Sequence, residues 1–326
     1  MKRTESTAII PAPKTDLAPA AELVDSARAY AAAAMAESTA RAYRADWSHF
    51  TDWCAARGFT PMPATAETVG LYITDMADAG LKPATIDRRL ATIRKAHRAA
   101  GIDAPASEGL RAVRRGIRRT ISTAQRQAAP VGLEELRRLV SEDVLPSCIL
   151  AAARDRAVIL VGFSAALRRS ELVALRAEDV AFSDRGMVIT VRRSKTDQEG
   201  AGRQVAVPFS RQRDLCAVSA LRSWLARAGI TAGPLFREVR GERVAESSLC
   251  DRSVARIIQR AADRAGLDAS LFSGHSLRAG FATAAAAAGI HERDIQRQTG
   301  HRSVAVLRRY IRAGELWRDN AAGALL

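Results

Sequence analysis

The sequence has few of the residues on which several protein classes depend. Among its 326 residues are four cysteines, Cys54, Cys148, Cys216 and Cys250, and no two of them form a CxxC pair. Neither a disulfide framework nor a cysteine-based zinc site is therefore indicated. The sequence also lacks a Walker phosphate-binding motif and a carboxylate cluster like those of two-metal nucleases. We expect neither a metal nor another cofactor.

Long apolar segments are missing as well. The run from Val158 to Leu167 is apolar, but a helix needs about 20 apolar residues to span a bilayer. The N-terminal stretch MKRTESTAIIPAPKTD has no apolar core of the kind found in signal peptides. These two absences argue against a membrane protein and predict a cytoplasmic one.

Acidic residues are fewer than basic ones. The chain has 35 acidic and 50 basic residues, a formal net charge of +15. Such a charge favours a polyanionic partner, either nucleic acid or an anionic membrane surface, and the lack of a membrane segment favours nucleic acid. Lysine is scarce even among the basic residues, with 45 arginines and five lysines, so Lys195, the one lysine in the second half, needs an explanation.

The length predicts about two domains. Residues 187–191 (MVITV) and 204–209 (QVAVPF) predict a β-hairpin within an otherwise helical second half. Lys195 lies where the first of these strands runs into the turn. The predicted organisation is a flexible tail at 1–20, a helical domain at 21–119, a linker at 120–131 and a second domain at 132–326 that ends in a tail helix.

Two helices of the first domain are predicted from their spacing. Ser38 and Thr39 are expected to cap a helix that ends at Gly58, and a second helix follows Pro83. Aromatic residues at helical spacing in the first of these helices indicate a core face rather than a base-stacking platform. The residues expected to face inward are Tyr43, Trp47, Phe50, Trp53, Ile86, Leu90 and Ile93.

A stripe of arginines is expected on a third helix, GLRAVRRGIRR. Its arginines recur at i, i+3, i+4, i+7 and i+8, which places them on one helical face. Like charges so placed repel each other, and the stripe itself contains no acid. We therefore favour a surface that contacts DNA phosphates over a merely solvated face. The predicted DNA contacts are Arg88, Arg89, Arg98, Arg111, Arg114, Arg115, Arg118 and Arg119.

The residues with catalytic potential lie far apart in the second half of the chain. Taken singly, each signal is weak, because a lone tyrosine is more often in a core and an Arg-x-x-Glu spacing is usually an ion pair on a helix. The order and spacing of the whole set carry the weight. The set is Arg168 in LRRSEL, Lys195 in RRSKTD, His275 and Arg278 in HSLR, His301 in TGH and Tyr310 in RRY.

With these motifs in this order, residues 132–312 resemble the catalytic domain of the tyrosine recombinase (phage integrase) family. The segments STARAYRADWSHFTDWC and TIDRRLATIRKAH resemble the family's helical, SAM-like core-binding domain. The resemblance implies a mainly α fold with a small β-hairpin or sheet in an α+β catalytic domain. It is closest to the simple two-domain, Cre-like or Xer-like type, without the arm-binding domain of larger integrases.

The resemblance also implies roles for the set. Tyr310 is expected to attack a DNA phosphate and form a 3′-phosphotyrosyl link, aided by neighbouring arginines that lower its pKa. The guanidinium groups of Arg168 and Arg278 suit the phosphate oxygens. His275 is expected to accept the tyrosine proton, and Lys195 to protonate the leaving oxygen. His301 is expected to donate a hydrogen bond to the phosphate.

The expected partner is double-stranded DNA with an inverted-repeat target site, bound by a tetramer that recombines two duplexes through a Holliday junction. Such a protein would integrate, excise or resolve DNA, and would associate with the nucleoid. The two domains would clamp the duplex, with the linker crossing it. The C-terminal tail, GELWRDNAAGALL, would dock on a neighbouring subunit or pack on its own domain.

Two other functions use parts of the same chemistry. A type IB topoisomerase would relax supercoiled plasmid without a specific target, whereas the first domain and the compact size favour a recombinase. A non-catalytic, sequence-specific DNA-binding regulator would form no covalent DNA adduct. The complete catalytic set argues against this second alternative.

Overall fold

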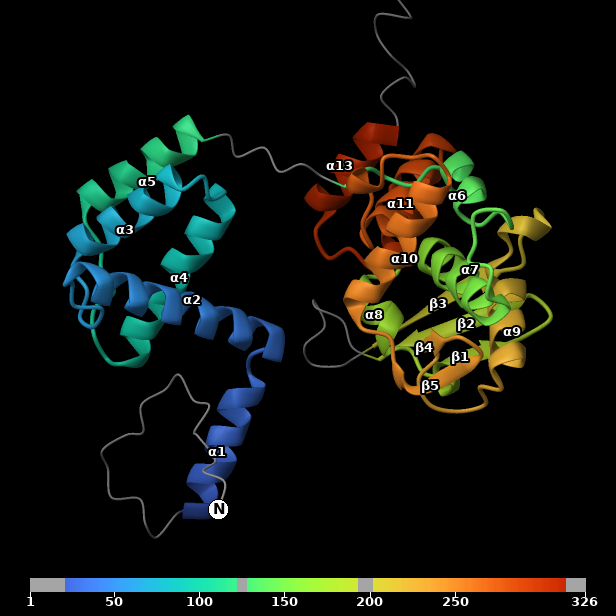
Figure 1. Ribbon diagram of the computed structural model, residues 1–326, viewed down its shortest axis with the longest axis horizontal. Helices are drawn as coiled ribbons and strands as arrows, with labels where there is room; N and C mark the ends of the chain where they lie inside the picture. Colours follow the sequence, from blue (N-terminus) through green and yellow to red (C-terminus); the bar gives the residue numbers. More distant parts are fainter. Residues whose placement is uncertain (1–20, 122–127, 193–201, 315–326) are drawn as a thin grey trace, which may run out of the picture. The chain divides into compact units, whose positions relative to one another are not determined.

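The computed structural model describes residues 21–121, 128–192 and 202–314. The chain divides between residues 126 and 127 into two compact units (Figure 1). Each unit has a hydrophobic core of its own. The division falls within the segment that was predicted as a linker.

The described part of the first unit is helical. Its core is formed by large side chains that include Phe50, Tyr72, Ile86, Leu90 and Ile93, all nearly or fully buried. Its helices are α1 (Ala21–Ala33), α2 (Glu37–Arg57), α3 (Ala66–Asp78), α4 (Pro83–Ala99) and α5 (Glu108–Thr120).

Helix α2 confirms one predicted end and corrects the other. Gly58 ends the helix in the left-handed conformation, with φ of 71°, as glycine readily does. The predicted cap at Ser38 and Thr39 is wrong, because the helix begins at Glu37 and its N-cap is Ala36, which has no side chain able to cap. Of the predicted core aromatics, Phe50 and Trp53 are buried, whereas Tyr43 and Trp47 are half-buried.

The second unit combines helices with two small sheets. Its α-helices are α6 (Leu133–Leu139), α7 (Ile149–Ser164), α8 (Arg169–Ala174), α9 (Ala217–Ala228), α10 (Asp251–Arg264), α11 (Ser276–Ala287), α12 (Glu292–Thr299) and α13 (Val304–Gly314). Its strands are β1 (Val180–Phe182), β2 (Gly186–Val191), β3 (Arg203–Pro208), β4 (Arg237–Arg240) and β5 (Arg243–Ser248). The strands gather at one end of the unit, away from α11 and α13 (Figure 1).

The predicted hairpin is confirmed as β2 and β3. They pair antiparallel with Ile189 opposite Val205, and β1 adds a third strand on the free edge of β2. The structure also has a β4–β5 hairpin, which was not predicted. Its strands, REVR and RVAESS, are largely charged or polar, so they lack the apolar alternation by which strands are found in a sequence.

Helix α7 forms the centre of the second core. Its residues from Ala157 to Val161 are fully buried, which accounts for the apolar run seen in the sequence. In Figure 1, α7 passes beside α9 and toward α11. The run is therefore a buried core helix, and in the described residues no helix is long and apolar enough to cross a membrane.

Residues 128–131, which were predicted within the linker, pack on the second unit next to α11. The Ala129 N–H donates to the Leu271 carbonyl at 2.8 Å, and the Val131 N–H donates to the Ser276 carbonyl at 3.0 Å. A Cβ at Gly280 would lie 2.0 Å from the Val131 carbonyl oxygen. Glycine therefore allows this segment to lie directly against α11.

Candidate active site

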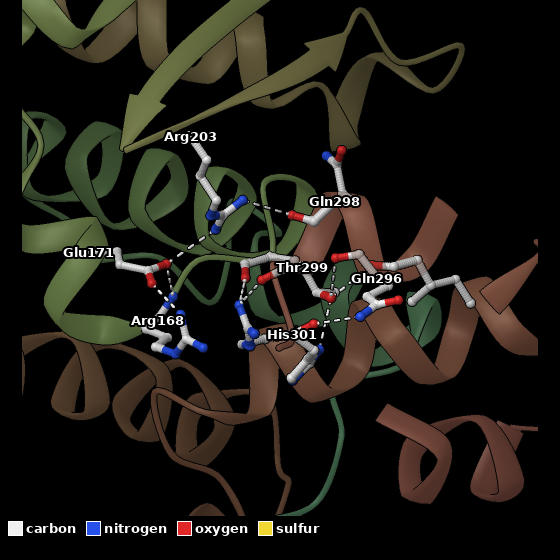
Figure 2. A network of polar contacts seen from close by, with 10 residues as sticks. Arg168, Glu171, Arg203, Gln296, Gln298, Thr299 and His301 are labelled. Carbon is white, nitrogen blue, oxygen red and sulfur yellow. Dashed lines mark hydrogen bonds and ion pairs between the residues drawn. The ribbon is translucent and has the colours of Figure 1, made fainter. Parts of the chain in front are cut away.

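The candidate active site is built around the C-terminal end of α12. The last carbonyls of a helix have no partner within it, and here two of them accept hydrogen bonds from arginines. Arg203 donates to the Gln298 carbonyl at 3.0 Å (Figure 2), and Arg278 donates to the Thr299 carbonyl. The negative end of the helix dipole favours positive charge at this position.

Gly300 allows the helix to end where the arginines need it. It has φ of 64°, a left-handed conformation that costs glycine little. A Cβ at this position would lie 2.8 Å from Nε of Arg203 and 3.1 Å from its Cζ. The glycine of the TGH motif is therefore required both by the turn and by the close approach of the Arg203 guanidinium.

Arg278, in the first turn of α11, is almost completely buried. Its Nη1 also donates to the Ala166 carbonyl at 2.7 Å, and its Nη2 is buried with no hydrogen-bond partner among the described residues. Burial, together with Arg168, lowers the pKa of Arg278 to about 10, so the group stays charged near neutral pH. A buried, unpaired guanidinium nitrogen is costly, and an anionic oxygen would satisfy it.

Glu171 holds two further arginines. Its Oε1 accepts from Arg168 Nη1 at 2.5 Å, and its Oε2 accepts from the Arg168 N–H at 3.0 Å and from Arg203 Nη2 at 3.3 Å (Figure 2). Burial acts to raise the pKa of Glu171, but the hydrogen bonds from Arg168 and the charge of Arg203 hold it below its ordinary value. The carboxylate is thus ionised and fixes the direction of both guanidinium groups.

His275 and Tyr310 meet across α11 and α13. His275 Nε2 lies 2.8 Å from the Tyr310 hydroxyl. Burial and the charges of Arg278 and Arg168 lower the pKa of His275. The imidazole is therefore neutral near neutral pH, and in that state it can accept the phenolic proton.

The expectation that neighbouring arginines lower the pKa of Tyr310 is wrong for the free protein. Burial raises the pKa of Tyr310, and this outweighs the opposing effect of Arg278 and Arg309. Arg308 lies at the surface, where it pairs with Glu292 at 3.2 Å. Because Arg308 and Arg309 are exposed, water screens their charge, and removal of the phenolic proton would need a base such as His275.

His301 also lies beside Tyr310, with ring centroids 6.0 Å apart. Its Nδ1 is 2.8 Å from Oγ1 of Thr299, and its carbonyl accepts from the Gln296 side chain at 2.8 Å (Figure 2). Burial, followed by the charge of Arg278, lowers the pKa of His301 to about 3. The imidazole is therefore neutral in the free protein.

The structure thus brings together five of the six predicted catalytic residues: Arg168, His275, Arg278, His301 and Tyr310. Lys195 lies outside the described residues, although Arg203, at the start of the strand that follows it, belongs to the site. Within 21–121, 128–192 and 202–314, no three His, Cys, Asp or Glu side chains cluster as metal ligands would.

The predicted DNA-contacting arginines of α4 differ in exposure. Arg88 pairs with the buried Asp46 at 2.6 Å and is 43% exposed, whereas Arg89 is only 16% exposed and lies 3.6 Å from the same carboxylate. Arg98 is exposed. Arg89 is therefore mainly an internal ion-pair partner in the free protein, because its guanidinium faces Asp46 and His49.

Four of the five arginines in the α5 stripe also form ion pairs, and the fifth, Arg119, is exposed. Arg111 and Arg115 both contact Glu108, at 2.7 and 2.8 Å. Arg114 and Arg118 lie 2.6 and 3.8 Å from Asp87, on α4. The stripe itself contains no acid, but it is not a surface of unpaired cations, because Glu108 precedes it by a helical turn and Asp87 comes from the neighbouring helix α4. Exposed ion pairs contribute little to stability, so these arginines can still exchange partners.

Comparison with known proteins decides the family. A profile of the phage integrase family matches residues 134–315, and a profile of the phage integrase N-terminal SAM-like domain matches residues 30–101. The chain belongs to the phage integrase family. This integrase is accordingly a site-specific tyrosine recombinase, and the predicted fold class is confirmed.

Relatives of this integrase cover most of its length. It is 44% identical over 291 residues to an integrase/recombinase xerD homolog of Selenomonas ruminantium. The aligned region covers 88% of this chain and 84% of that protein. It is 27% identical to the recombinase cre of Escherichia phage P1, over 80% and 79% of the two chains. A lambda integrase structure shares its fold with a TM-score of 0.62 at 18% identity, over 91% and 96% of the chains.

Three residues of the site were not singled out from the sequence. Arg203 is one of 45 arginines and follows no motif, so no sequence signal marked it. The Arg-x-x-Glu spacing of Arg168 and Glu171 indicated only an ion pair on a helix, but the Glu171 side chain is 1% exposed and also pairs with Arg203. Thr299 stands within the TGH motif, but its hydroxyl contact with His301 depends on how α12 ends.

Proposed function

We propose that this recombinase cleaves and rejoins DNA strands at a specific site through Tyr310. The phenolic oxygen attacks the phosphorus of a phosphodiester as its proton passes to His275. The bond between phosphorus and the 5′ oxygen breaks, and Lys195 supplies the proton that the leaving oxygen takes up. A 3′-phosphotyrosyl link and a free 5′-hydroxyl result, and attack by another 5′-hydroxyl reverses the step on a new strand.

The remaining residues act on the phosphate. As attack proceeds, charge builds on its non-bridging oxygens, and fixed cations stabilise that charge most when they are already oriented. Arg168 and Arg278 are oriented by Glu171 and by backbone carbonyls. His301 would contact the same oxygens. Because the phosphodiester energy is kept in the phosphotyrosyl link, the reaction needs no nucleotide cofactor.

One observation carries this proposal. The Tyr310 hydroxyl lies 2.8 Å from a neutral imidazole nitrogen, beside the buried guanidinium of Arg278 with its unpaired Nη2. A nucleophile, a base and an anion-binding group are therefore within one site. A tyrosine buried only for packing would need no such arrangement.

The proposed partner is double-stranded DNA with an inverted-repeat target. Solved structures with the same fold include a lambda integrase dimer bound to a COC′ core site and XerH bound to difH, the latter with a TM-score of 0.58 at 18% identity. We assign residues 21–119 to core-site binding and the second unit to catalysis. The active assembly is proposed to be a tetramer that joins two duplexes through a Holliday junction.

A covalent-adduct assay tests the proposal. The target can be selected from random duplexes by affinity for the whole protein, then prepared with a nick that lets the 5′ fragment diffuse away. The Tyr310→Phe protein should bind this DNA as the parent does but form no adduct, since only the nucleophilic oxygen is lost. Tyr30→Phe is the matched control, because Tyr30 is 78% exposed on α1, and it should form adducts normally.

Two outcomes would overturn the proposal. Adducts formed by Tyr310→Phe would assign the nucleophile to another residue. Failure of the parent protein to form adducts on DNA that it binds specifically would show that this chain is not catalytic. Sedimentation of the protein with two nicked duplexes tests the tetramer separately.

A further inference from the structure

Thr299 places its hydroxyl between the end of α12 and the imidazole of His301. Thr299 is fully buried and His301 is 9% exposed. Oγ1 of Thr299 lies 2.7 Å from the Ile295 carbonyl oxygen, 3.4 Å from that of Gln296 and 2.8 Å from Nδ1 of His301. The hydroxyl therefore lies within hydrogen-bond distance of carbonyl oxygens on one side and of a ring nitrogen on the other (Figure 2).

The number of protons available decides which group donates. A threonine hydroxyl has one proton, whereas a carbonyl oxygen can only accept. Two oxygens 2.7 Å apart repel each other unless a proton lies between them, so the hydroxyl proton points to the Ile295 carbonyl. The short contact between Oγ1 and His301 Nδ1 then requires a second proton, which only Nδ1 can supply.

We infer that Thr299 is a positioning residue that keeps neutral His301 in the tautomer with the proton on Nδ1. In this tautomer Nε2 carries a lone pair. Nε2 can then donate a hydrogen bond to a phosphate oxygen only after it has gained a proton itself. The consequence for catalysis rests on the proposed function, whereas the tautomer is a property of the free protein.

The charged groups around His301 allow its Nε2 to gain a proton only when DNA is bound. The charged and titratable groups around it are Arg278 on α11, His275 just before that helix, Arg168 before α8, Arg203 on β3 and Tyr310 on α13. Three of these are permanent cations, which disfavour an imidazolium in the free protein. A DNA phosphate would offset their charge, and His301 could then become protonated on Nε2. Cleavage should accordingly decline as pH rises through the pKa that His301 has in the DNA complex.

His97 provides an internal reference for the measurement. Its Nδ1 lies 2.8 Å from the Ile93 carbonyl, and its Nε2 accepts from the Ala64 N–H at 2.9 Å. Because a carbonyl only accepts and an amide N–H only donates, His97 must also carry its proton on Nδ1. It lies in the first unit, so changes at Thr299 should leave its signals unaltered.

The test is nitrogen-15 NMR of the whole protein labelled at histidine, near neutral pH and without DNA. His301 is assigned by the signals lost in His301→Gln. We expect the parent and Thr299→Ser to show protonated Nδ1, as His97 does. Thr299→Val, which keeps the shape but removes the hydroxyl, should show a substantial population with protonated Nε2.

A parent protein in which His301 carries its proton on Nε2 would overturn the inference, and so would a Thr299→Val protein with Nδ1 alone protonated. The first result is measured on the parent protein, so it does not depend on whether any variant folds. Neither outcome bears on Tyr310, whose adduct assay tests the proposed function separately.

The catalytic consequence is measured on nicked target DNA. We expect Thr299→Val to cleave roughly 10- to 100-fold more slowly, as for loss of a hydrogen bond to a charged group. Its rate should also depend less on pH, because the Nε2-protonated neutral ring can donate directly. Thr299→Ser should restore the parent profile. A parent-like pH profile in Thr299→Val would contradict this consequence.

Discussion

The two units both gather arginines, but they hold them in different ways. On α5, the arginines are largely exposed and pair with carboxylates at the surface, Glu108 and Asp87. In the second unit, Arg203 and Arg278 are held by backbone carbonyls at the end of α12, and the buried Glu171 holds Arg168. The first arrangement exchanges partners easily, whereas the second fixes each guanidinium in place.

This difference suits the two proposed roles, DNA binding by the first unit and catalysis by the second. Long, exposed side chains can follow the irregular path of a DNA backbone, and water screens their charge. Buried cations stabilise a transition state because they need no reorganisation when charge develops. Backbone carbonyls orient a guanidinium without neutralising it, so the three arginines around Glu171 share one negative charge. A positive site therefore remains for the phosphate.

The largest effect on the rate of DNA cleavage is expected at Lys195, where an arginine cannot replace the lysine. Lys195 is proposed to give a proton to the leaving oxygen, and arginine, with a pKa above about 12, holds its proton too tightly. Lys195→Arg should therefore cleave about 10²-fold more slowly or worse, with DNA affinity nearly unchanged. Lys82→Arg, an exposed lysine of the first unit, is the control and should cleave normally.

A sulfur substitution sharpens this result. A 5′-bridging sulfur leaves as a thiolate and needs no proton, so Lys195→Arg should recover on that substrate. If the variant stays slow with sulfur, the lysine acts by positioning or by phosphate contact instead.

The next effect is on stability and its pH dependence. Glu171→Gln leaves two half-buried arginines, Arg203 and Arg168, without their buried anion, and we expect the free energy of unfolding to fall by about 3 kcal/mol. The pKa of Glu171 is held below its ordinary value in the folded protein. Its stabilisation is therefore complete above the unfolded-state pKa of about 4.3 and is lost as pH falls through the folded value.

Denaturant unfolding as a function of pH measures both the loss of stability and its pH dependence. The parent should lose stability more steeply on acidification than Glu171→Gln does. Glu134→Gln, which removes an exposed acid paired with Arg137, should behave like the parent. Equal acid sensitivity in the parent and Glu171→Gln would show that this carboxylate does not orient the arginines as an ion.

The smallest effect is expected at the α5 stripe. If Arg114, Arg115 and Arg118 contact phosphates, replacing all three with Gln should flatten the plot of log affinity against log salt, by roughly 0.9 per contact. Folding stability should barely change, since exposed pairs contribute little. An unchanged slope, with binding otherwise intact, would leave the stripe as a solvated face paired with Glu108 and Asp87.

Much of the molecule was predictable from local pattern. The inward faces of α2 and α4, the end of α2 at Gly58 and the β2–β3 hairpin all depend on spacing within a short segment. The charged hairpin β4–β5 was missed because its strands have almost no apolar alternation. The cap of α2 was misplaced because a threonine within the first turn of a helix looks, in sequence, much like one that precedes it.

The sequence by itself determined the family and predicted a set of reactive residues, because the order of motifs along the chain can be recognised whatever their separation in space. Only the tertiary structure decided how they are held. That Arg203 joins Glu171, that Asp87 faces the α5 stripe and that Thr299 bonds His301 all depend on contacts between elements or on the path of the chain at a helix end. Such contacts leave no periodic signal, since they are set by packing and by which buried polar groups find partners.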